Sequence, residues 1–255
     1  MSIKVTFLGT GTSQGVPLIA CNCDVCTSSD SRDKRLRSSI LVETARTRVV
    51  IDAGPDFRQQ LLREKIKRLD AVIFSHEHKD HIAGLDDVRA FNFIMGTPMP
   101  VYATKRVEKA LKREFSYIFS DEKYPGVPEI SIIDFEDNPF VAGDLMIEPL
   151  NVMHYKLPVK GFKVKKFAYI TDANFIPEHE MEKLYQMDVL VLNALRREPH
   201  ISHFTLNEAV ELVKVLKPRK AYFTHISHQL GRHADVSREL PENIELGCDG
   251  LQLVI

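Results

Sequence analysis

The sequence predicts an α/β fold, arranged as one domain in which two β-sheets are flanked by outer helices. Strand-like and helix-like segments alternate twice along the 255 residues, and side chains of metal-binding types directly follow several of the expected strands. Length alone would allow one large or two small domains, but the chain contains neither a short-period repeat nor a linker. We therefore expect a single domain spanning residues 1–255.

The first half of the chain should contain five strands and three helices. Apolar residues alternate with polar ones or form short runs at 3–8, 39–43, 48–51, 71–74 and 101–103, which predicts strands. Pro55 suits the first turn of a helix reaching residue 63, helical spacing predicts another helix over 85–94, and Thr104 caps one ending near residue 115. Residues 116–128 mix aromatic residues, charges and prolines, which favours a lid or cap loop.

The second half shows the same alternation. Strand-like runs occur at 130–133, 145–150, 167–170, 189–192 and 221–223. Residues 177–185 should be helical, and 205–216 should form an amphipathic helix with Thr205 as its N-cap. Between the strands lies a lysine-rich segment that we expect to be a solvated hairpin rather than a phosphate site: Lys160, Lys163, Lys165 and Lys166.

Composition excludes several classes of partner. Lys+Arg 34 against Asp+Glu 35 gives a net charge of −1, so no overall field attracts nucleic acid or an anionic membrane. The first residues do not resemble a signal peptide, and no apolar run approaches membrane-spanning length. The bunching of three of the four cysteines argues against a disulfide framework. We expect a cytoplasmic protein with no membrane partner and no nucleic acid.

Residues 75–84 carry the densest cluster of metal-binding side chains. His76, His78, Asp80 and His81 place three imidazoles and a carboxylate within six residues, on the loop that follows the strand expected at 71–74. These ligand types suit zinc, manganese or iron. They are more ligands than one ion needs from so short a segment, which favours two ions that together hold an oxyanion and activate water. The alternative is a solvated polar loop.

Three further ligand candidates, His154, Asp172 and His225, also come just after strand-like runs. A single histidine after a strand is more often structural, but the shared position of all three strengthens the set. With the first cluster they make seven ligands, enough for two ions that each keep a position open. Asp172 could bridge the two ions because a carboxylate has two oxygens.

A second metal site, with soft sulfur ligands, is indicated by Cys21, Cys23 and Cys26. Three thiolates at this spacing select zinc but lack the fourth ligand of a closed tetrahedral site. His228, three residues after His225, could complete a structural zinc site of three cysteines and one histidine. The alternative is a loop of three reduced cysteines without metal.

The chain resembles metallo-β-lactamase-fold hydrolases, and among them the PhnP-like phosphodiesterases that are accessory to the carbon–phosphorus lyase pathway. The resemblance implies an αββα sandwich of two mixed β-sheets flanked by helices, two active-site ions (Mn²⁺ or Zn²⁺) and one structural Zn²⁺. It implies that His76, His78 and His154 hold one ion, that Asp80, His81 and His225 hold the other, that Asp172 bridges them, and that Asp52 orients the histidine loop. Its motifs span nearly the whole chain: Gly9-x-Gly11-Thr12-Ser13-x-Gly15-Val16-Pro17, Cys21/Cys23/Cys26, Asp52-x-Gly54, His76 to His81, His154, Thr171-Asp172-Ala173 and His225 with His228.

Residues 200–205 resemble the segment in which such phosphodiesterases keep a histidine near the leaving group. A histidine there can protonate the departing alkoxide. His203, directly before the helix cap, matches the segment better than His200. Asp80, His203 and His200 are therefore the catalytic candidates.

The expected activity is hydrolysis of a small or cyclic phosphodiester by a dinuclear metal-bound hydroxide, in a monomer or a homodimer. No arginine cluster stands beside the ligand motifs, so a singly charged diester should be preferred to a monoester dianion. Alternatives within the fold are a thioester or lactone hydrolase and an RNA-processing nuclease. A non-catalytic protein similar to PqqB, which acts in cofactor biosynthesis, is a further alternative that a complete seven-ligand set makes less favourable.

Overall fold

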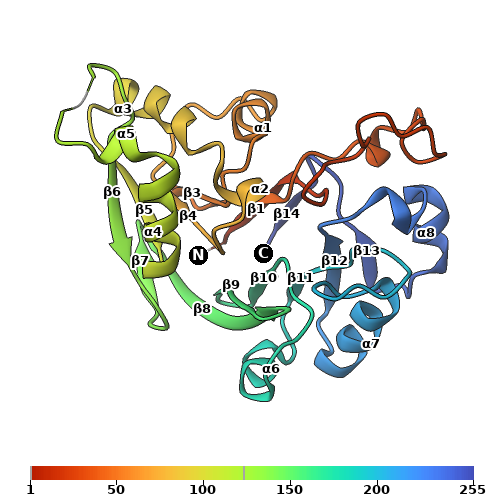
Figure 1. The fold of residues 1–255 in the computed structure, drawn as a ribbon. Helices are drawn as coiled ribbons and strands as arrows, with labels where there is room; N and C mark the ends of the chain where they lie inside the picture. The colour runs from red at the N-terminus through yellow and green to blue at the C-terminus, as the bar shows by residue number, and fades with distance from the viewer. Residues whose placement is uncertain (1, 123) are drawn as a thin grey trace.

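Two β-sheets packed face to face form the centre of the molecule in the computed structural model, which describes residues 2–122 and 124–255. Over these residues each sheet has seven strands. Helices cover the outer faces: α1, α3, α4 and α5 lie over one sheet, and α6, α7 and α8 over the other (Figure 1). The expected fold class, two mixed sheets flanked by helices, is confirmed.

The first sheet mixes an antiparallel part with a parallel part. Strands β14, β1, β2 and β3 pair antiparallel, and β3 to β6 continue in parallel. Its strands in spatial order are β14 (Gln252–Val254), β1 (Lys4–Gly9), β2 (Ser39–Glu43), β3 (Arg48–Ile51), β4 (Ala71–Ile73), β5 (Met99–Ala103) and β6 (Ile130–Asp134). Its helices are α1 (Phe57–Arg63), α2 (Lys79–Ile82), α3 (Arg89–Met95), α4 (Lys105–Glu114) and α5 (Ser116–Phe119), with 3₁₀ turns η1 (Ser31–Asp33) and η2 (Leu85–Val88).

The second sheet is also mixed. Strands β10 to β13 run parallel, while β7, β8, β9 and β10 pair antiparallel. In spatial order they are β13 (Ile244–Leu246), β12 (Lys220–Thr224), β11 (Val189–Asn193), β10 (Phe167–Ile170), β9 (Leu157–Val164), β8 (Leu145–His154) and β7 (Phe140–Ala142). Its helices are α6 (Glu178–Leu184), α7 (Leu206–Leu216) and α8 (His233–Glu239), with the 3₁₀ turn η3 (His228–Leu230).

The central core lies between the two sheets. Side chains such as Phe7 and Ile40 from the first sheet meet Phe162 and Tyr169 from the second, and each of these four is at most 1% exposed. Burial of such large apolar surfaces is the main favourable term in folding. Two further clusters lie between each sheet and its own helices. The sandwich therefore holds the strand ends of both sheets in fixed positions.

Capping residues set the starts of two helices as expected. The Thr104 hydroxyl accepts a hydrogen bond from the Val107 backbone at the start of α4. Thr205 begins α7 with a complete capping box, in which its hydroxyl accepts from the backbone of Glu208 and the Glu208 carboxylate accepts from the backbone of Thr205. This cap fixes the backbone two residues after His203.

The lysine-rich segment differs in part from its expected solvated state. A hairpin is present, because β9 and β10 pair antiparallel and Lys165 and Lys166 form the exposed turn between them. Lys160, however, is buried within β9, with its ammonium 2.5 Å from Asp137 and 2.6 Å from the side-chain oxygen of Asn151. Residues 85–94 divide into η2 and α3 instead of one helix. The expected lid at 116–128 begins with α5, and its residue 123 lies outside the described residues.

No helix in the described ranges is both long and apolar enough to span a membrane.

Candidate metal centre and catalytic site

The predicted ligands lie where strands of both sheets end. Asp52 follows β3, the histidine loop follows β4, Asp172 follows β10 and His225 follows β12. Asp52, Asp172 and His225 all have left-handed backbones, with φ of 67°, 55° and 55°. Such backbones are costly for residues other than glycine and concentrate at functional sites. The three side chains are thus turned sharply out of their strands.

Gly54 lets the histidine loop pack directly on the chain after β3. A Cβ atom at this position would lie 1.9 Å from the backbone oxygen of Asp80. Only glycine permits so close an approach of two backbones. The glycine of the Asp52-x-Gly54 motif therefore serves to seat the loop that carries Asp80 and His81.

Asp52 anchors the histidine loop through three hydrogen bonds. It accepts from the backbone N–H and the hydroxyl of Ser75, and from Nδ1 of His81, each at 2.8 Å. The Ser75 hydroxyl lies 2.9 Å from Nδ1 of His76. Because that hydroxyl already donates to Asp52, Nδ1 of His76 must donate to it. With Nδ1 of both histidines held in this way, Nε2 is the ring nitrogen that each can offer to a cation. The orienting contacts expected of Asp52 are present.

Asp172 belongs to both groups of donor atoms in the centre. One group contains Asp80, His81, Asp172 and His225, and the other His154, Asp172 and His203, with all ligand atoms of a group within 4.8 Å of one another. Oxygens of Asp172 lie 3.1 Å from His81 Nε2 and 3.2 Å from His225 Nε2. This position between two groups is the one a bridging ligand needs.

His76, His78 and His154 gather on one side of the centre. Their ring centroids are 4.6 Å apart for His76 and His78, 5.2 Å for His78 and His154, and 5.9 Å for His76 and His154. Nδ1 of His154 donates to the backbone oxygen of Ser202 at 2.8 Å, since a carbonyl can only accept. That bond leaves Nε2 of His154 free to coordinate.

The donor atoms fit a cation better than they fit one another. Nε2 of His76 and of His81 are buried, and among the described residues neither has a hydrogen-bond partner, although carboxylate oxygens lie 3.1 Å from His81 Nε2. Burial disfavours charge on His81, but Asp80, Asp172 and Asp52 outweigh it and raise its pKa well above the ordinary value. Burial would likewise raise the pKa of Asp172, yet His225 and His81 lower it well below the ordinary value. The pocket therefore attracts positive charge.

Among the described residues, His203 shares a group of potential ligand atoms with His154 and Asp172, whereas His200 belongs to neither group at the centre. The His203 ring centroid is 4.5 Å from that of His154 and 4.8 Å from that of His225, and the His200 ring lies 5.1 Å from His203 at a tilt of 39°. Burial, followed by the charge of His225, lowers the pKa of His203 to about 2. The imidazole is thus neutral near pH 7 and presents one N–H. This geometry favours His203 over His200 as the residue beside the reacting group.

The thiol cluster assembles with His228 as the sequence suggests. Cys21, Cys23, Cys26 and His228 place one ligand atom each within a 4.8 Å group, with the Cys21 and Cys23 sulfurs 3.5 and 3.3 Å from Nδ1 of His228. The hydrogen bond from His228 lowers the pKa of Cys23 to about 6, which favours the thiolate that metals bind. Four ligands at this distance match a closed zinc site.

Two cations missed from the sequence line the entrance to the centre. A pocket of about 400 Å³ has His78 and His154 in its wall together with Arg106 and Lys156. The sequence motifs have no arginine cluster beside them, but α4 brings one arginine, Arg106, to the histidine loop, where its Nε donates to Glu77 at 2.6 Å. No local signal marked Arg106, since it lies far from the motifs along the chain.

Comparison with known proteins agrees with the fold and the centre. The family model of the beta-lactamase superfamily domain matches residues 47–226. The chain therefore belongs to the beta-lactamase superfamily. It has the metallo-β-lactamase fold and is PhnP-like: a similar crystal structure is described as a new diphosphatase from the PhnP family (41% identity, TM-score 0.94, covering 100% of this chain and 98% of that one).

Two other known proteins are similar to this chain. An octanoyltransferase of Porphyromonas gingivalis is 39% identical over 99% of this chain. The chain spans only about half of that relative, 52% of its length. The Zn²⁺-bound PqqB of Methylobacterium extorquens has a TM-score of 0.77 over 98% of this chain and 99% of its own at 20% identity, which shows the fold alone.

Proposed function

We propose that this chain is a metal-dependent phosphodiesterase that hydrolyses a small or cyclic phosphodiester. The observation that carries the proposal is the position of Asp172, which belongs to two groups of imidazole and carboxylate ligands. A pocket whose wall contains the ligands His78 and His154 also contains the cations Arg106 and Lys156. A relative of 41% identity that is described as a diphosphatase supports chemistry at phosphorus.

The residues present fit two divalent ions, Mn²⁺ or Zn²⁺. His76, His78 and His154 would hold one, Asp80, His81 and His225 the other, and Asp172 would contact both. When bound, such a pair supplies a water nucleophile that is ionised near neutral pH and neutralises charge on the phosphoryl oxygens. A third ion, structural Zn²⁺, would be held by Cys21, Cys23, Cys26 and His228.

The protein's own groups prepare the site for this chemistry. Asp52 and Ser202 hold His81 and His154 in fixed orientations, so that little rearrangement is needed when ligands bind. His203 would protonate the leaving oxygen as the imidazolium: burial favours its neutral form in the free protein, and the negative charge of a bound phosphoryl group would favour the protonated form that a general acid needs. Arg106 and Lys156 attract the anionic substrate to the entrance.

We further propose a cytoplasmic enzyme with a small-molecule substrate, acting as a monomer or homodimer without a membrane or nucleic-acid partner. The net charge of −1 supports the last point, since nucleic-acid-binding surfaces need excess positive charge. An RNA-processing nuclease is therefore the less favoured alternative. A non-catalytic PqqB-like role is less favoured because the set of seven predicted ligands is complete.

Hydrolysis of a thioester or lactone is the second candidate. The relative named octanoyltransferase favours acyl chemistry, but this chain matches only 52% of that protein, and the name does not say which half performs the transfer. The metal ligands alone suit either class, because both reactions need an activated water and a stabilised oxyanion.

A parallel assay separates the candidates. Metal-analysed protein would be given bis(p-nitrophenyl) phosphate, p-nitrophenyl phosphate, a thioester and a lactone. We expect the diester to be cleaved fastest, because Glu77 compensates part of the charge that Arg106 would offer to a dianion. Hydrolysis of the thioester or lactone alone, or equal rates on the two phosphate esters, would contradict the phosphodiesterase assignment.

A further inference from the structure

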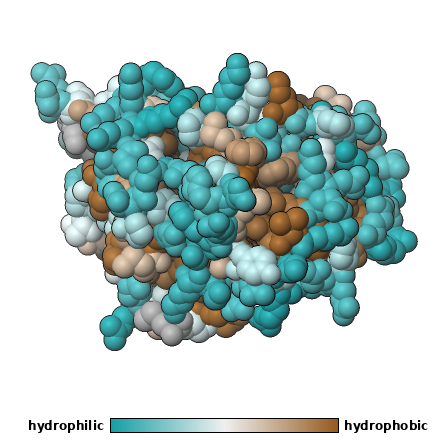
Figure 2. Space-filling view, turned by 90° about the horizontal axis from the view of Figure 1, so that it is seen from below, coloured by the Kyte–Doolittle hydropathy of each residue, from teal (hydrophilic) through white to brown (hydrophobic). Residues whose placement is uncertain are grey.

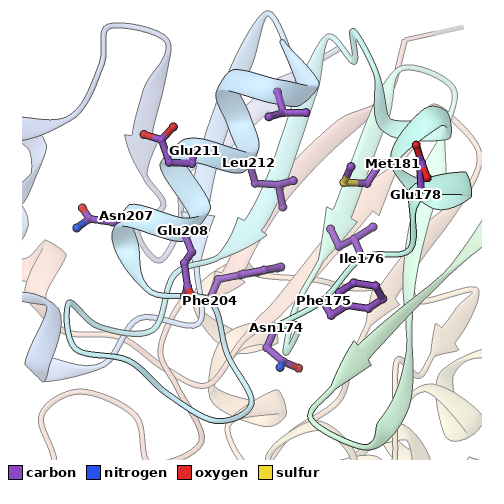
Figure 3. Close-up of a pocket in the computed structure, with 11 residues that line it drawn as sticks. Asn174, Phe175, Ile176, Glu178, Met181, Phe204, Asn207, Glu208, Glu211 and Leu212 are labelled. Carbon is purple, nitrogen blue, oxygen red and sulfur yellow. The ribbon is translucent and has the colours of Figure 1, made fainter.

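A long apolar groove lies between α6 and α7, on the outer face of the second sheet. Its volume is about 840 Å³, within the range of small-molecule sites. Figure 3 shows its apolar side chains facing one another across the gap, Leu212 and Phe204 on one side and Met181, Ile176 and Phe175 on the other. The helix α7 that forms one wall has eleven residues, so the wall is about 16 Å long at 1.5 Å per residue.

The groove leaves large apolar side chains open to solvent. Phe175 is 56% exposed and Val215 57% exposed. Figure 2, seen from the side on which α6 and α7 lie, shows a hydrophobic patch there surrounded by hydrophilic atoms. Contiguous exposed apolar surface of this kind usually marks a binding site.

The inner end of the groove adjoins the entrance to the metal centre. Asn174 lines the groove, and its side chain accepts a hydrogen bond from the backbone of Tyr155 (2.6 Å) and donates to the carbonyl of Ile201 (3.3 Å). Tyr155 and Ile201 both line the pocket that contains His78 and His154, and they are 49% and 66% exposed. The groove and the entrance are therefore adjacent, with Asn174 between them and the large side chains of Tyr155 and Ile201 on the entrance side.

Charge distinguishes the two ends of this surface. The entrance carries Arg106 and Lys156. The groove instead carries the carboxylates of Glu178, Glu208 and Glu211, although Glu211 is paired with Lys214. An anionic head group is thus attracted to the metal centre and repelled from the groove, while a hydrocarbon chain is suited only to the groove.

We propose that this groove binds the hydrocarbon part of the substrate, so that the preferred phosphodiester carries a linear alkyl or acyl chain on one of its alcohols. This rests on the proposed function for the phosphoryl end, but the chain-binding surface is a separate set of residues. The adjacency of the groove to the entrance and the opposite charges of the two ends favour an amphiphilic small molecule over a protein segment.

The test is a series of p-nitrophenyl alkyl phosphodiesters from methyl to dodecyl. We expect kcat/KM to rise with chain length, by up to about fourfold for each methylene that leaves water. Val215→Glu should flatten the rise for the longest chains, because Val215 lies in the last turn of α7, far from the cap beside His203. Phe175→Ser should reduce the rise in kcat/KM even for short chains. Val141→Glu, at a similarly exposed valine on β7, is the matched control and should keep the wild-type dependence.

Two further measurements separate failure of the groove from failure of the reaction. Titration calorimetry should find dodecyl phosphate bound more tightly than methyl phosphate, and Val215→Glu should remove the difference. Chain-dependent binding without hydrolysis of any diester would keep the groove and reject the phosphodiesterase. Equal kcat/KM across the series would overturn the proposal. A Val215→Glu variant whose molar mass by light scattering changes, while its kcat/KM still rises with chain length as in the unaltered protein, would also overturn it and would indicate that the groove is a subunit interface.

Discussion

Asp172 is the residue on which the chemistry of the centre depends most. It is almost completely buried, and its side chain faces His81 and His225 at 3.1 and 3.2 Å. Burial alone would keep such a carboxyl protonated, but the neighbouring imidazoles lower its pKa well below the ordinary value. It therefore remains an anion with two oxygens, which is what a ligand between two cations must be.

His203→Ala should slow substrates with poor leaving groups far more than those with activated ones. A general acid assists the departure of a basic alkoxide and is hardly needed for p-nitrophenolate, and its usual contribution is roughly 10²–10⁴-fold. The measurement is kcat for a methyl or alkyl phosphodiester compared with bis(p-nitrophenyl) phosphate. His200→Ala is the matched control, because His200 contacts His203 but stands farther from the other ligands.

Equal losses on both substrate types in His203→Ala would show that His203 positions the substrate or binds metal instead. The ligand atoms of His203, His154 and Asp172 lie within 4.8 Å of one another, so His203 could bind a metal ion, and metal analysis of the variant would detect that role.

At the residue scale, the sequence was sufficient to predict which side chains gather at the centre, because metal ligands must be histidine, carboxylate or thiol. It could not predict Arg106 at the entrance or the burial of Lys160. Both follow from tertiary packing: α4 carries Arg106 to Glu77, and pairing of β9 on both sides draws Lys160 inward to Asp137.

At the scale of elements, the cysteine loop is tied to the strand end that carries His225. Gly11 forms a bridge with Ile226, and the backbone N–H of Thr12 donates to the carbonyl of Ile226 at 3.1 Å. His228 extends the same segment into the thiol group. A zinc ion at this position would join a long loop to the turn that presents a catalytic-site histidine.

The variant Cys21→Ser/Cys23→Ser should lose one zinc per chain and unfold at a lower temperature, because a closed structural site contributes folding energy. A loss of about 2 kcal/mol would lower Tm by roughly 4–8 °C for a domain of this size. Activity measured below the transition should fall much less than stability. The measurements are elemental analysis and thermal unfolding.

Cys248→Ser is the control for this variant, since Cys248 lies outside the thiol group and is not expected to bind zinc. Unchanged zinc content in the double variant would reject the thiol site outright.

Elements with clear periodicity or caps were predictable, whereas strands with a short or interrupted apolar pattern were not. Thr104 and Thr205 marked their helices because capping is a local interaction. The strand β9 escaped prediction because glycine and two lysines interrupt its apolar pattern, and its neighbours β8 and β10 supply the stabilisation. The short strand β14 likewise exists through its pairing with β1.

At the scale of the whole molecule, the centre lies between the two sheets and takes residues from both. Asp52 and the histidine loop belong to the first sheet, and His154, Asp172 and His225 to the second. The strand order that brings them together could not be derived from the sequence, because pairing between distant strands depends on the common core rather than on any local signal. Ions at the centre would thus link the two halves of the sandwich.

Mn²⁺ should therefore raise the stability of the entire chain. Thiolates select zinc, whereas imidazole and carboxylate accept manganese, so Mn²⁺ added to chelator-treated protein should act mainly at the centre between the sheets. At a free concentration of about 100 Kd one ion adds about 2.7 kcal/mol, which corresponds to roughly 5–10 °C in Tm. If residues 1–255 are a single domain, calorimetry should show one transition that moves as a unit.

Asp172→Asn is the decisive control for this shift. Asparagine tolerates the left-handed backbone that Asp172 adopts at φ 55°, so the apo variant should fold, but its neutral amide cannot offset the charge of two cations. The Mn²⁺-dependent rise in Tm should then be much smaller than in the unaltered protein. An equal rise in the two proteins would show that the ion binds elsewhere, and two separate transitions would show that the sheets fold independently.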